Sequence, residues 1–169
     1  TFVWEKADGT SEEIKVPGRY RVPAGETMVL TTTLPDNYDE TAFAIRSSLQ
    51  DVKFYIGGEL RAEYSTKETR LVGKNSASRF VFCPTSYKDA GKELRLELTT
   101  YTSNYSGVVN SIYCGDQSAI WQIIFHQYGP STFIGFFVLF SGMTIILFSM
   151  ILGFLYHIDF DMELSLIHI

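Results

Sequence analysis

The sequence predicts an all-β antiparallel sandwich or jelly roll over residues 1–115, followed by a transmembrane α-helix over residues 131–157. Two observations support this division. Residues 117–158 contain no Asp, Glu, Lys or Arg, a run of 42 residues, and all but three of the 33 charged side chains precede it. The earlier part alternates apolar and polar residues in short runs, as half-buried strands do.

Eight strand-like runs are spaced along residues 1–115, with turn residues between them. Regularly spaced short strands with turn signals are typical of sandwiches and jelly rolls. The runs around Gly57-Gly58 predict a hairpin, because both glycines can adopt positive φ. The runs cover residues 2–4, 28–34, 41–47, 52–56, 59–64, 79–83, 94–98 and 108–114.

Two cysteines, Cys83 and Cys114, lie 31 positions apart. In an oxidising compartment they could form a disulfide; the alternative is two buried free thiols that pack as small apolar residues. The two cysteines and the three histidines (His126, His157 and His168) do not suggest a structural zinc site, so no metal site is expected.

Residues 116–130 are interpreted as a juxtamembrane helix or linker, capped by Asp116 and ended by Gly129-Pro130. The apolar stretch 133–155 has 23 residues, which as a helix would extend roughly 34 Å and cross a bilayer. Within it, Gly135, Gly142 and Ser149 recur every seven residues and mark one face, which favours packing against another helix, such as that of a second copy in a homodimer.

The chain begins at Thr1 without a recognisable signal peptide, and we expect an N-terminal portion to be missing. Residues 158–169 are predicted to be a cytoplasmic stub. Its last six residues, 164–169 (LSLIHI), read as an in-frame translation of the transposon adapter CTGTCTCTTATACACATC, which favours an artefact; the alternative is a short natural apolar tail.

Composition excludes several functions. The net charge is −5, with 14 basic and 19 acidic residues, which argues against a nucleic-acid partner. The β region contains no histidine, so a Ser-His-Asp or Cys-His site there would lack its base. No catalytic residue and no cofactor is expected in this chain.

A polar-aromatic loop, residues 101–106, is the predicted binding site. Its residues Tyr101, Ser103, Asn104 and Tyr105 could stack on and hydrogen-bond a small polar molecule or a carbohydrate. The alternative is that these tyrosines pack half-buried against strands, as many tyrosines do.

Three segments carry a family resemblance: the strand end Thr33-Leu34-Pro35, the hairpin run 52–60 (VKFYIGGEL) and the run 87–98 (YKDAGKELRLEL), ahead of a span that begins Ile134-Gly135-Phe136-Phe137. They resemble the extracytoplasmic jelly-roll sensor domain of bacterial seven-transmembrane receptors with diverse intracellular signalling modules. The closest resemblance is to receptors of gut Firmicutes that end in a GGDEF-type diguanylate cyclase. The resemblance implies a galactose-binding-like fold and a bacterial cell membrane, and it supplies no ligand residues.

Two functions therefore stay open. The first is a ligand-sensing input domain with the first transmembrane helix of a signalling receptor whose cyclase or kinase domain lies outside this chain. The second is a membrane-anchored carbohydrate-binding module, with the helix as a tether. In both, we expect the β domain to be extracytoplasmic, because it is rich in strands, Tyr, Thr and Ser and has two cysteines.

Overall fold

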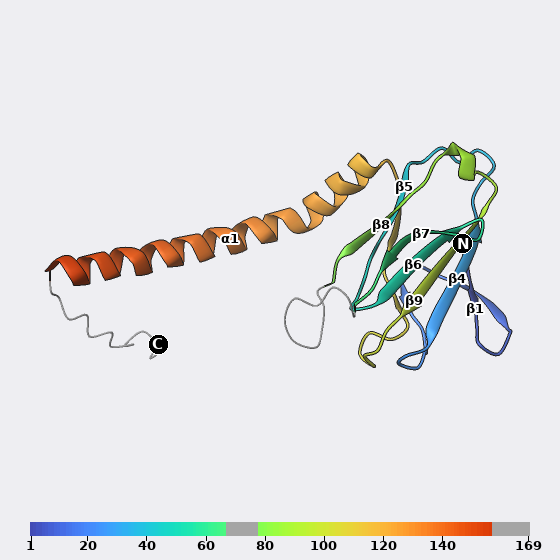
Figure 1. Cartoon of the computed structure of the whole chain (residues 1–169), viewed down its shortest axis with the longest axis horizontal. Helices are drawn as coiled ribbons and strands as arrows, with labels where there is room; N and C mark the ends of the chain where they lie inside the picture. Colours follow the sequence, from blue (N-terminus) through green and yellow to red (C-terminus); the bar gives the residue numbers. More distant parts are fainter. Residues whose placement is uncertain (67–77, 157–169) are drawn as a thin grey trace. The chain divides into compact units, whose positions relative to one another are not determined.

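The computed structural model describes residues 1–66 and 78–156 (Figure 1). The chain forms two compact units, Thr1–Trp121 and Gln122–Ile169, which are described separately below. The predicted stub 158–169, its adapter-like end 164–169, and His157 at the end of the predicted span all lie outside the described residues.

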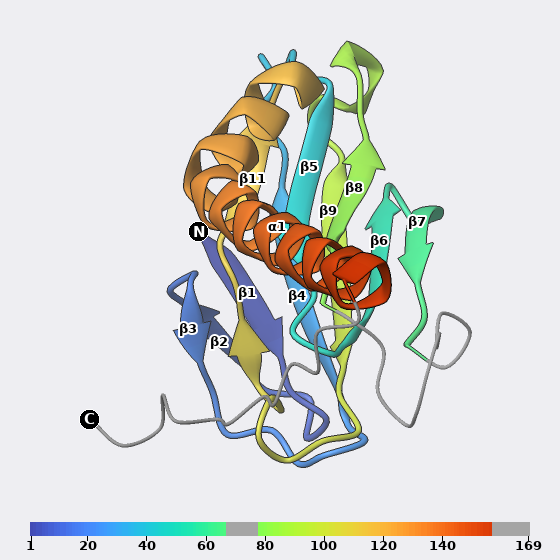
Figure 2. The ribbon, with the colours of Figure 1, turned by 90° about the vertical axis from the view of Figure 1, so that its left-hand side faces the viewer.

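The first unit is built from antiparallel β-sheets, as the sequence predicts (Figures 1 and 2). The largest has six strands in the order β2-β1-β4-β9-β6-β7, a second has the order β11-β5-β8, and β10 pairs with β3. The strands are β1 Phe2–Glu5, β2 Ser11–Ile14, β3 Gly18–Arg19, β4 Thr27–Thr33, β5 Ala42–Arg46, β6 Asp51–Ile56, β7 Glu59–Tyr64, β8 Phe80–Pro84, β9 Glu93–Thr99, β10 Val108–Val109 and β11 Ile112–Gly115.

The core of this unit is one cluster to which both larger sheets contribute alternate side chains. The six-stranded sheet buries residues of β4, β6 and β9, and the three-stranded sheet buries residues of β5 and β8. Burial of a large apolar side chain contributes about 1.5–3 kcal/mol, so the alternation in the sequence fixes which face of each strand turns inward. The central members are Met28, Leu30, Phe43, Ile45, Val52, Phe54, Ile56, Val81, Cys83, Leu94, Leu96 and Leu98.

The predicted strands are confirmed with small changes of boundary. The Gly57-Gly58 hairpin joins β6 to β7, with φ of 57° and 83° at the two glycines. The run 108–114 divides into β10 and β11, and β2 and β3 were not predicted. The antiparallel, sandwich-like arrangement is therefore established, whereas the jelly-roll topology stays a prediction.

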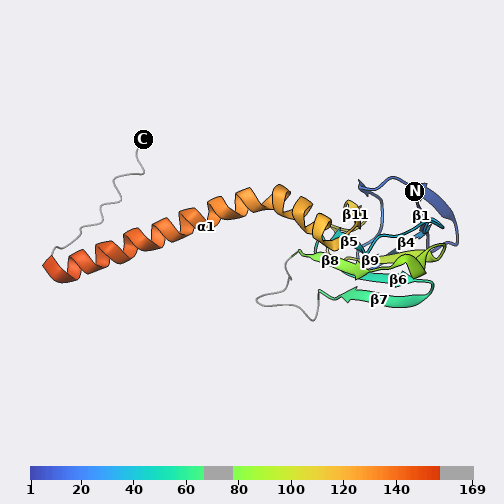
Figure 3. The same cartoon turned by 90° about the horizontal axis from the view of Figure 1, so that it is seen from above.

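The helix α1 (Gln117–Tyr156) is continuous (Figure 3). The expectation that Gly129-Pro130 ends a separate short helix is wrong, because Pro130 lies inside α1. A proline removes one backbone hydrogen bond of the helix, but the remaining residues of α1 can still form theirs. Two residues after Pro130, the Thr132 hydroxyl donates to the carbonyl of Tyr128 at 2.9 Å. In an apolar stretch the helix is the conformation that satisfies the backbone.

Among the described residues, α1 is the one helix long and apolar enough to cross a membrane. Its most apolar window has no residue buried within the structure, unlike a core helix of a soluble domain. The Thr144 hydroxyl donates a hydrogen bond to the carbonyl of Phe140 at 2.9 Å, so this polar side chain is satisfied within the helix.

Candidate ligand-binding recess

Polar side chains line the face of the six-stranded sheet that points away from the core. In the sheet register, Thr99 of β9 lies between Thr27 of β4 and Asp51 of β6, and Glu97 lies opposite Lys53 in the next outward row. Their neighbours along each strand, such as Leu98 and Val52, are buried. Alternation along a strand therefore places these polar groups side by side on the outer face.

This end of the outer face holds a recess of about 280 Å³, lined by Gly25, Thr27, Asp51, Lys53, Glu97, Thr99 and Tyr101. The lining combines two carboxylates, one ammonium group, two threonine hydroxyls and the phenol ring of Tyr101. Other recesses are larger: two, of about 570 and 460 Å³, are lined in part by Thr1 and Phe2, and one, of about 430 Å³, is lined by residues of α1. The recess beside Tyr101 is the one of these four that includes a residue of the predicted binding loop.

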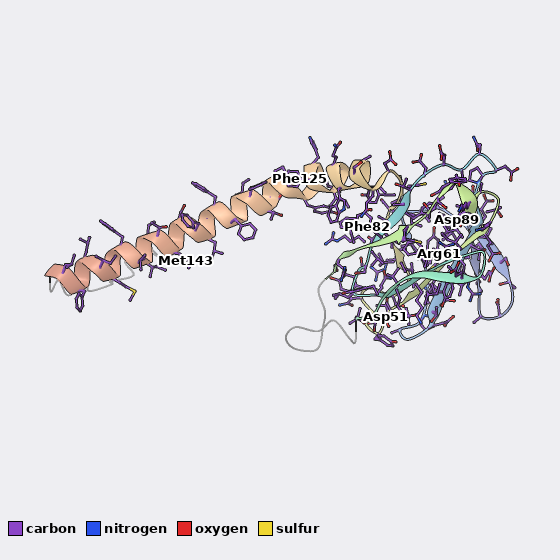
Figure 4. The ribbon with its side chains drawn as sticks, turned by 45° about the horizontal axis from the view of Figure 1, so that its top comes forward. Asp51, Arg61, Phe82, Asp89, Phe125 and Met143 are labelled. Carbon is purple, nitrogen blue, oxygen red and sulfur yellow. The ribbon has the colours of Figure 1, made fainter. Side chains whose placement is uncertain are left out.

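Asp51, labelled in Figure 4, is fixed by hydrogen bonds on both carboxylate oxygens. Its Oδ1 accepts from the backbone N–H and the hydroxyl of Thr66, each at 2.6 Å. Its Oδ2 accepts from the hydroxyl of Tyr101 at 3.2 Å. The Tyr101 side chain is tied to the recess by this bond, yet the residue remains 50% exposed.

Two of the three charged residues of the recess, Lys53 and Glu97, have ion-pair partners on neighbouring positions of the sheet. The ammonium group of Lys53 lies 3.0 Å from Glu63, and a carboxylate oxygen of Glu97 lies 2.7 Å from the guanidinium of Arg95. The hydrogen bond to Glu63 raises the pKa of Lys53 above its ordinary value, so this side chain stays cationic. The hydroxyls of Thr27 and Thr99 are 2.7 Å apart.

Of the four predicted loop residues, the recess includes Tyr101 alone. Ser103, Asn104 and Tyr105 are exposed and do not line it. The backbone carbonyl of Asn104 accepts a hydrogen bond from Arg19, so this residue helps to hold the loop in place. Binding by the loop stays a prediction, and the structure shifts its candidate site toward the sheet.

Gln50 positions the loop beside the recess from inside the domain. It is buried, and its amide nitrogen donates to the carbonyls of Val108 at 2.8 Å and Tyr105 at 3.4 Å. The hydroxyl of buried Ser106 contacts the carbonyls of Val22 at 2.7 Å and Pro23 at 3.1 Å. These bonds fix both the loop and the start of β6, where Asp51 lies.

Sequence reasoning missed Thr27, Asp51, Lys53, Glu97 and Thr99. The signal for them was present: each alternates with a buried residue of its strand. That alternation shows that they point outward, but only the pairing of three strands distant in the sequence shows that they are neighbours.

The two cysteines do not pair, and the disulfide alternative is wrong. Cys83 of β8 and Cys114 of β11 are both in register with Phe43, on opposite sides of β5. Two strand spacings separate them by roughly 9.5 Å, whereas bridged Cα atoms lie within about 7 Å. Both are free thiols; Cys83 is buried, but Cys114 is exposed, so the alternative of two buried thiols holds for Cys83 only.

The start of α1 belongs to the β unit. The Thr41 hydroxyl accepts a hydrogen bond from the N–H of Gln117 at 3.3 Å, and Ile120 is only 1% exposed. The ring of Trp121 stacks on Phe82 of β8, with centroids 4.9 Å apart and planes 25° from parallel. The first turn of the helix is therefore packed on the three-stranded sheet.

No cluster of three or more His, Cys, Asp or Glu residues that could hold a metal ion occurs in 1–66 and 78–156. The chain matches no protein-family model, no curated protein and no solved structure. Its class therefore rests on the structure itself: an antiparallel β domain that continues directly into a helix capable of crossing a membrane.

Proposed function

We propose that the chain is the ligand-binding input portion of a bacterial membrane receptor. In this proposal the β unit lies outside the cytoplasm and binds a small polar ligand, and α1 anchors it and carries the signal. The observation that supports this best is the junction: no separate linker intervenes, because the first turn of α1 packs on the sheet through Ile120 and Trp121.

A receptor needs two states of unequal ligand affinity and a route from ligand to membrane. A short route exists here. β5, the central strand of the sheet that holds the helix start, leads through residues 47–50 into β6, which begins with Asp51 in the recess. In this turn Leu49 has φ of 54°, a conformation that costs a non-glycine residue about 1 kcal/mol or more. Strained backbone of this kind is found at switch segments as well as at other functional sites.

The resemblance to bacterial multi-pass receptors supports the same proposal and adds an output, a GGDEF-type diguanylate cyclase. The 169 residues contain no GGDEF sequence, so that activity would belong to another part of the receptor. The stripe Gly135, Gly142 and Ser149 would supply the helix contact through which two copies pair.

The alternative is a membrane-anchored carbohydrate-binding module. It uses the same recess, and α1 is then a tether. The boundary between the two compact units supports it, because this boundary lies between Trp121 and Gln122, only one turn into the helix.

Disulfide cross-linking in membranes separates the two functions without a ligand. In a Cys114→Ser background, single cysteines replace Gly135, Gly142 and Ser149, or, as controls about 200° round the helix, Phe137, Thr144 and Ile151. The cross-linking pattern is then compared with and without the double change Phe82→Ala and Trp121→Ala.

The receptor proposal predicts dimer cross-links at the small residues that change at least about twofold when the aromatic stack is removed. Phe80→Ala serves as the matched control, because Phe80 lies on the same strand but packs against Tyr113, at 6.2 Å. A pattern that the double change leaves identical to the wild type would contradict coupling and favour the tether.

A further inference from the structure

We infer that the recess on the outer face binds a neutral, polyhydroxylated small molecule of monosaccharide size. The inference rests on the proposed function in one respect, that this recess is the ligand site of the domain. It adds the chemical class of the ligand and the residues that recognise it.

Charge selects against ions. An anion in the recess would face the carboxylates of Asp51 and Glu97, and a cation would face the ammonium group of Lys53. Lys53 and Glu97 already have ion-pair partners on the sheet, Glu63 and Arg95, and the carboxylate of Asp51 already accepts hydrogen bonds on both oxygens, from Thr66 and Tyr101. An anion would therefore lose hydration beside two carboxylates, and a cation would lose hydration beside Lys53 and compete with the donors that already engage Asp51.

Hydroxyl groups suit this lining, because each one both donates and accepts a hydrogen bond. A carboxylate accepts from a ligand hydroxyl, an ammonium group donates to one, and the hydroxyls of Thr27 and Thr99 do either. Hydrogen bonds to charged groups are stronger than those between neutral groups. A compound with several adjacent hydroxyls could use the rows formed by Thr27, Thr99 and Asp51 and by Glu97 and Lys53.

The size of the recess and the aromatic side chain of Tyr101 favour a ligand with one small ring. A recess of about 280 Å³ is just below the usual range of small-molecule pockets, about 300–1,000 Å³. Tyr101, half exposed at the recess, offers an apolar ring face together with a polar hydroxyl. A sugar ring presents the complementary pair, a face of C–H groups and a rim of hydroxyls.

The recess is also held in place before a ligand arrives. Both oxygens of Asp51 are engaged by Thr66 and Tyr101, and Gln50 ties the loop after β9, through the carbonyl of Tyr105, to the start of β6. Ordering side chains on binding costs about 0.5–1.5 kcal/mol for each long side chain. Groups that are already fixed avoid much of this cost, which matters for a ligand with few atoms.

The test is isothermal titration of the full chain in detergent micelles with D-glucose, D-galactose and D-mannose. Two charged analogues, glucosamine at pH 6 and sodium glucuronate, test the electrostatic argument on the same ring. Tyr101→Ala and Lys53→Met alter the recess from two different elements. Tyr87→Ala is the matched control, because Tyr87 is 66% exposed and lies in the short helix η1 (Tyr87–Asp89).

We expect at least one neutral hexose to bind saturably, with a dissociation constant of about 1 mM or below. Each recess variant should weaken that binding at least about tenfold while keeping the wild-type circular dichroism, and Tyr87→Ala should not change it. Both charged analogues should bind at least about tenfold more weakly. Absence of saturable binding by all three neutral hexoses, tighter binding of a charged analogue, or binding that neither recess variant alters would overturn the inference.

The outcomes distinguish this inference from the proposed function. Two results together would support the recess as a sugar site and contradict the receptor proposal: sugar binding that depends on Tyr101 and Lys53, and a cross-linking pattern that stays the same when the Phe82–Trp121 stack is removed. Altered cross-linking without sugar binding would support the receptor and contradict the ligand class.

Discussion

The hydroxyl of Tyr101 donates a hydrogen bond to the carboxylate of Asp51 at 3.2 Å, between residues fifty positions apart in the sequence. The bond joins the loop after β9 to the first residue of β6. Asp51 also accepts two hydrogen bonds of 2.6 Å from Thr66. A single carboxylate therefore holds together the start of β6, the loop after β9 and the residues that follow β7, around the candidate recess.

Replacing Asp51 should therefore destabilise the β unit much more than replacing the Tyr101 hydroxyl. Asp51→Ala leaves two donors of Thr66 without an acceptor, and Thr66 is buried, so we expect a loss of about 1–3 kcal/mol. Tyr101→Phe removes one exposed hydrogen bond and should cost less than about 1 kcal/mol. Urea unfolding of the full chain in micelles, followed by near-ultraviolet circular dichroism, measures both; equal losses would contradict this role for Asp51.

Two glycines with similar backbone angles should respond differently to alanine. Gly107 and Gly9 have φ of 70° and 83°, so alanine is strained at both, by about 1–2 kcal/mol. At Gly107 the new Cβ would lie 1.9 Å from the carbonyl oxygen of Tyr20, whereas at Gly9 nothing lies within 4 Å. Gly107→Ala should therefore unfold at a clearly lower urea concentration than Gly9→Ala. Similar unfolding midpoints for the two variants would contradict the close approach of Gly107 to the carbonyl of Tyr20.

The folded protein should contain one accessible thiol. Cys114 is exposed, whereas Cys83 is buried; burial raises the pKa of both thiols, to about 12 for Cys83. We expect maleimide to modify one cysteine in the native protein and two after denaturation. Mass spectrometry of the peptides should place the native label on Cys114; rapid labelling of Cys83, or none of Cys114, would be inconsistent with the strand order.

Acid should weaken the β unit in part through Asp89, which lies near Arg61 (both labelled in Figure 4). Asp89 is buried, and its carboxylate accepts from Lys92 at 2.8 Å and from the N–H of Ser86 at 3.1 Å. The hydrogen bond from Lys92, the bond from Ser86 and the charges of Lys92 and Arg61 lower the pKa of Asp89, against the effect of burial.

A lowered pKa in the folded state means that the charged form stabilises the fold. This contribution is complete above the ordinary aspartate pKa of 3.8, and it is lost as the pH falls through the lower folded value. Asp89→Asn should reduce stability at pH 7 and flatten its dependence between pH 5 and pH 2. Parallel pH profiles for the variant and the wild type, measured by thermal unfolding, would exclude this contribution.

Much of the fold follows from local patterns. Alternation along 28–34, 52–56 and 94–98 identifies both the strands and their buried faces, because an apolar residue on the wrong face would lose its burial. The glycines of the β6–β7 hairpin and the charge-free run after Asp116 are equally local signals.

The parts that sequence reasoning missed depend on longer-range effects. The segment Ser11-Glu12-Glu13-Ile14 shows no alternation, yet it forms β2, since pairing with β1 satisfies its backbone. Pro130 predicts a helix end, but the apolar residues on both sides favour continuation. The recess needs the register of β4, β9 and β6, which no single segment contains.

The exposed thiol of Cys114 reports directly on whether the β unit lies outside the cytoplasm, anchored by α1. Spheroplasts of bacteria that produce the full chain are treated with a membrane-impermeant maleimide, and inside-out membrane vesicles are treated in parallel, with Cys114→Ser as the control for specificity. We expect Cys114 to be labelled in spheroplasts and protected in sealed inside-out vesicles. Labelling in the vesicles with protection in spheroplasts, or recovery of the chain outside the membrane fraction, would contradict it.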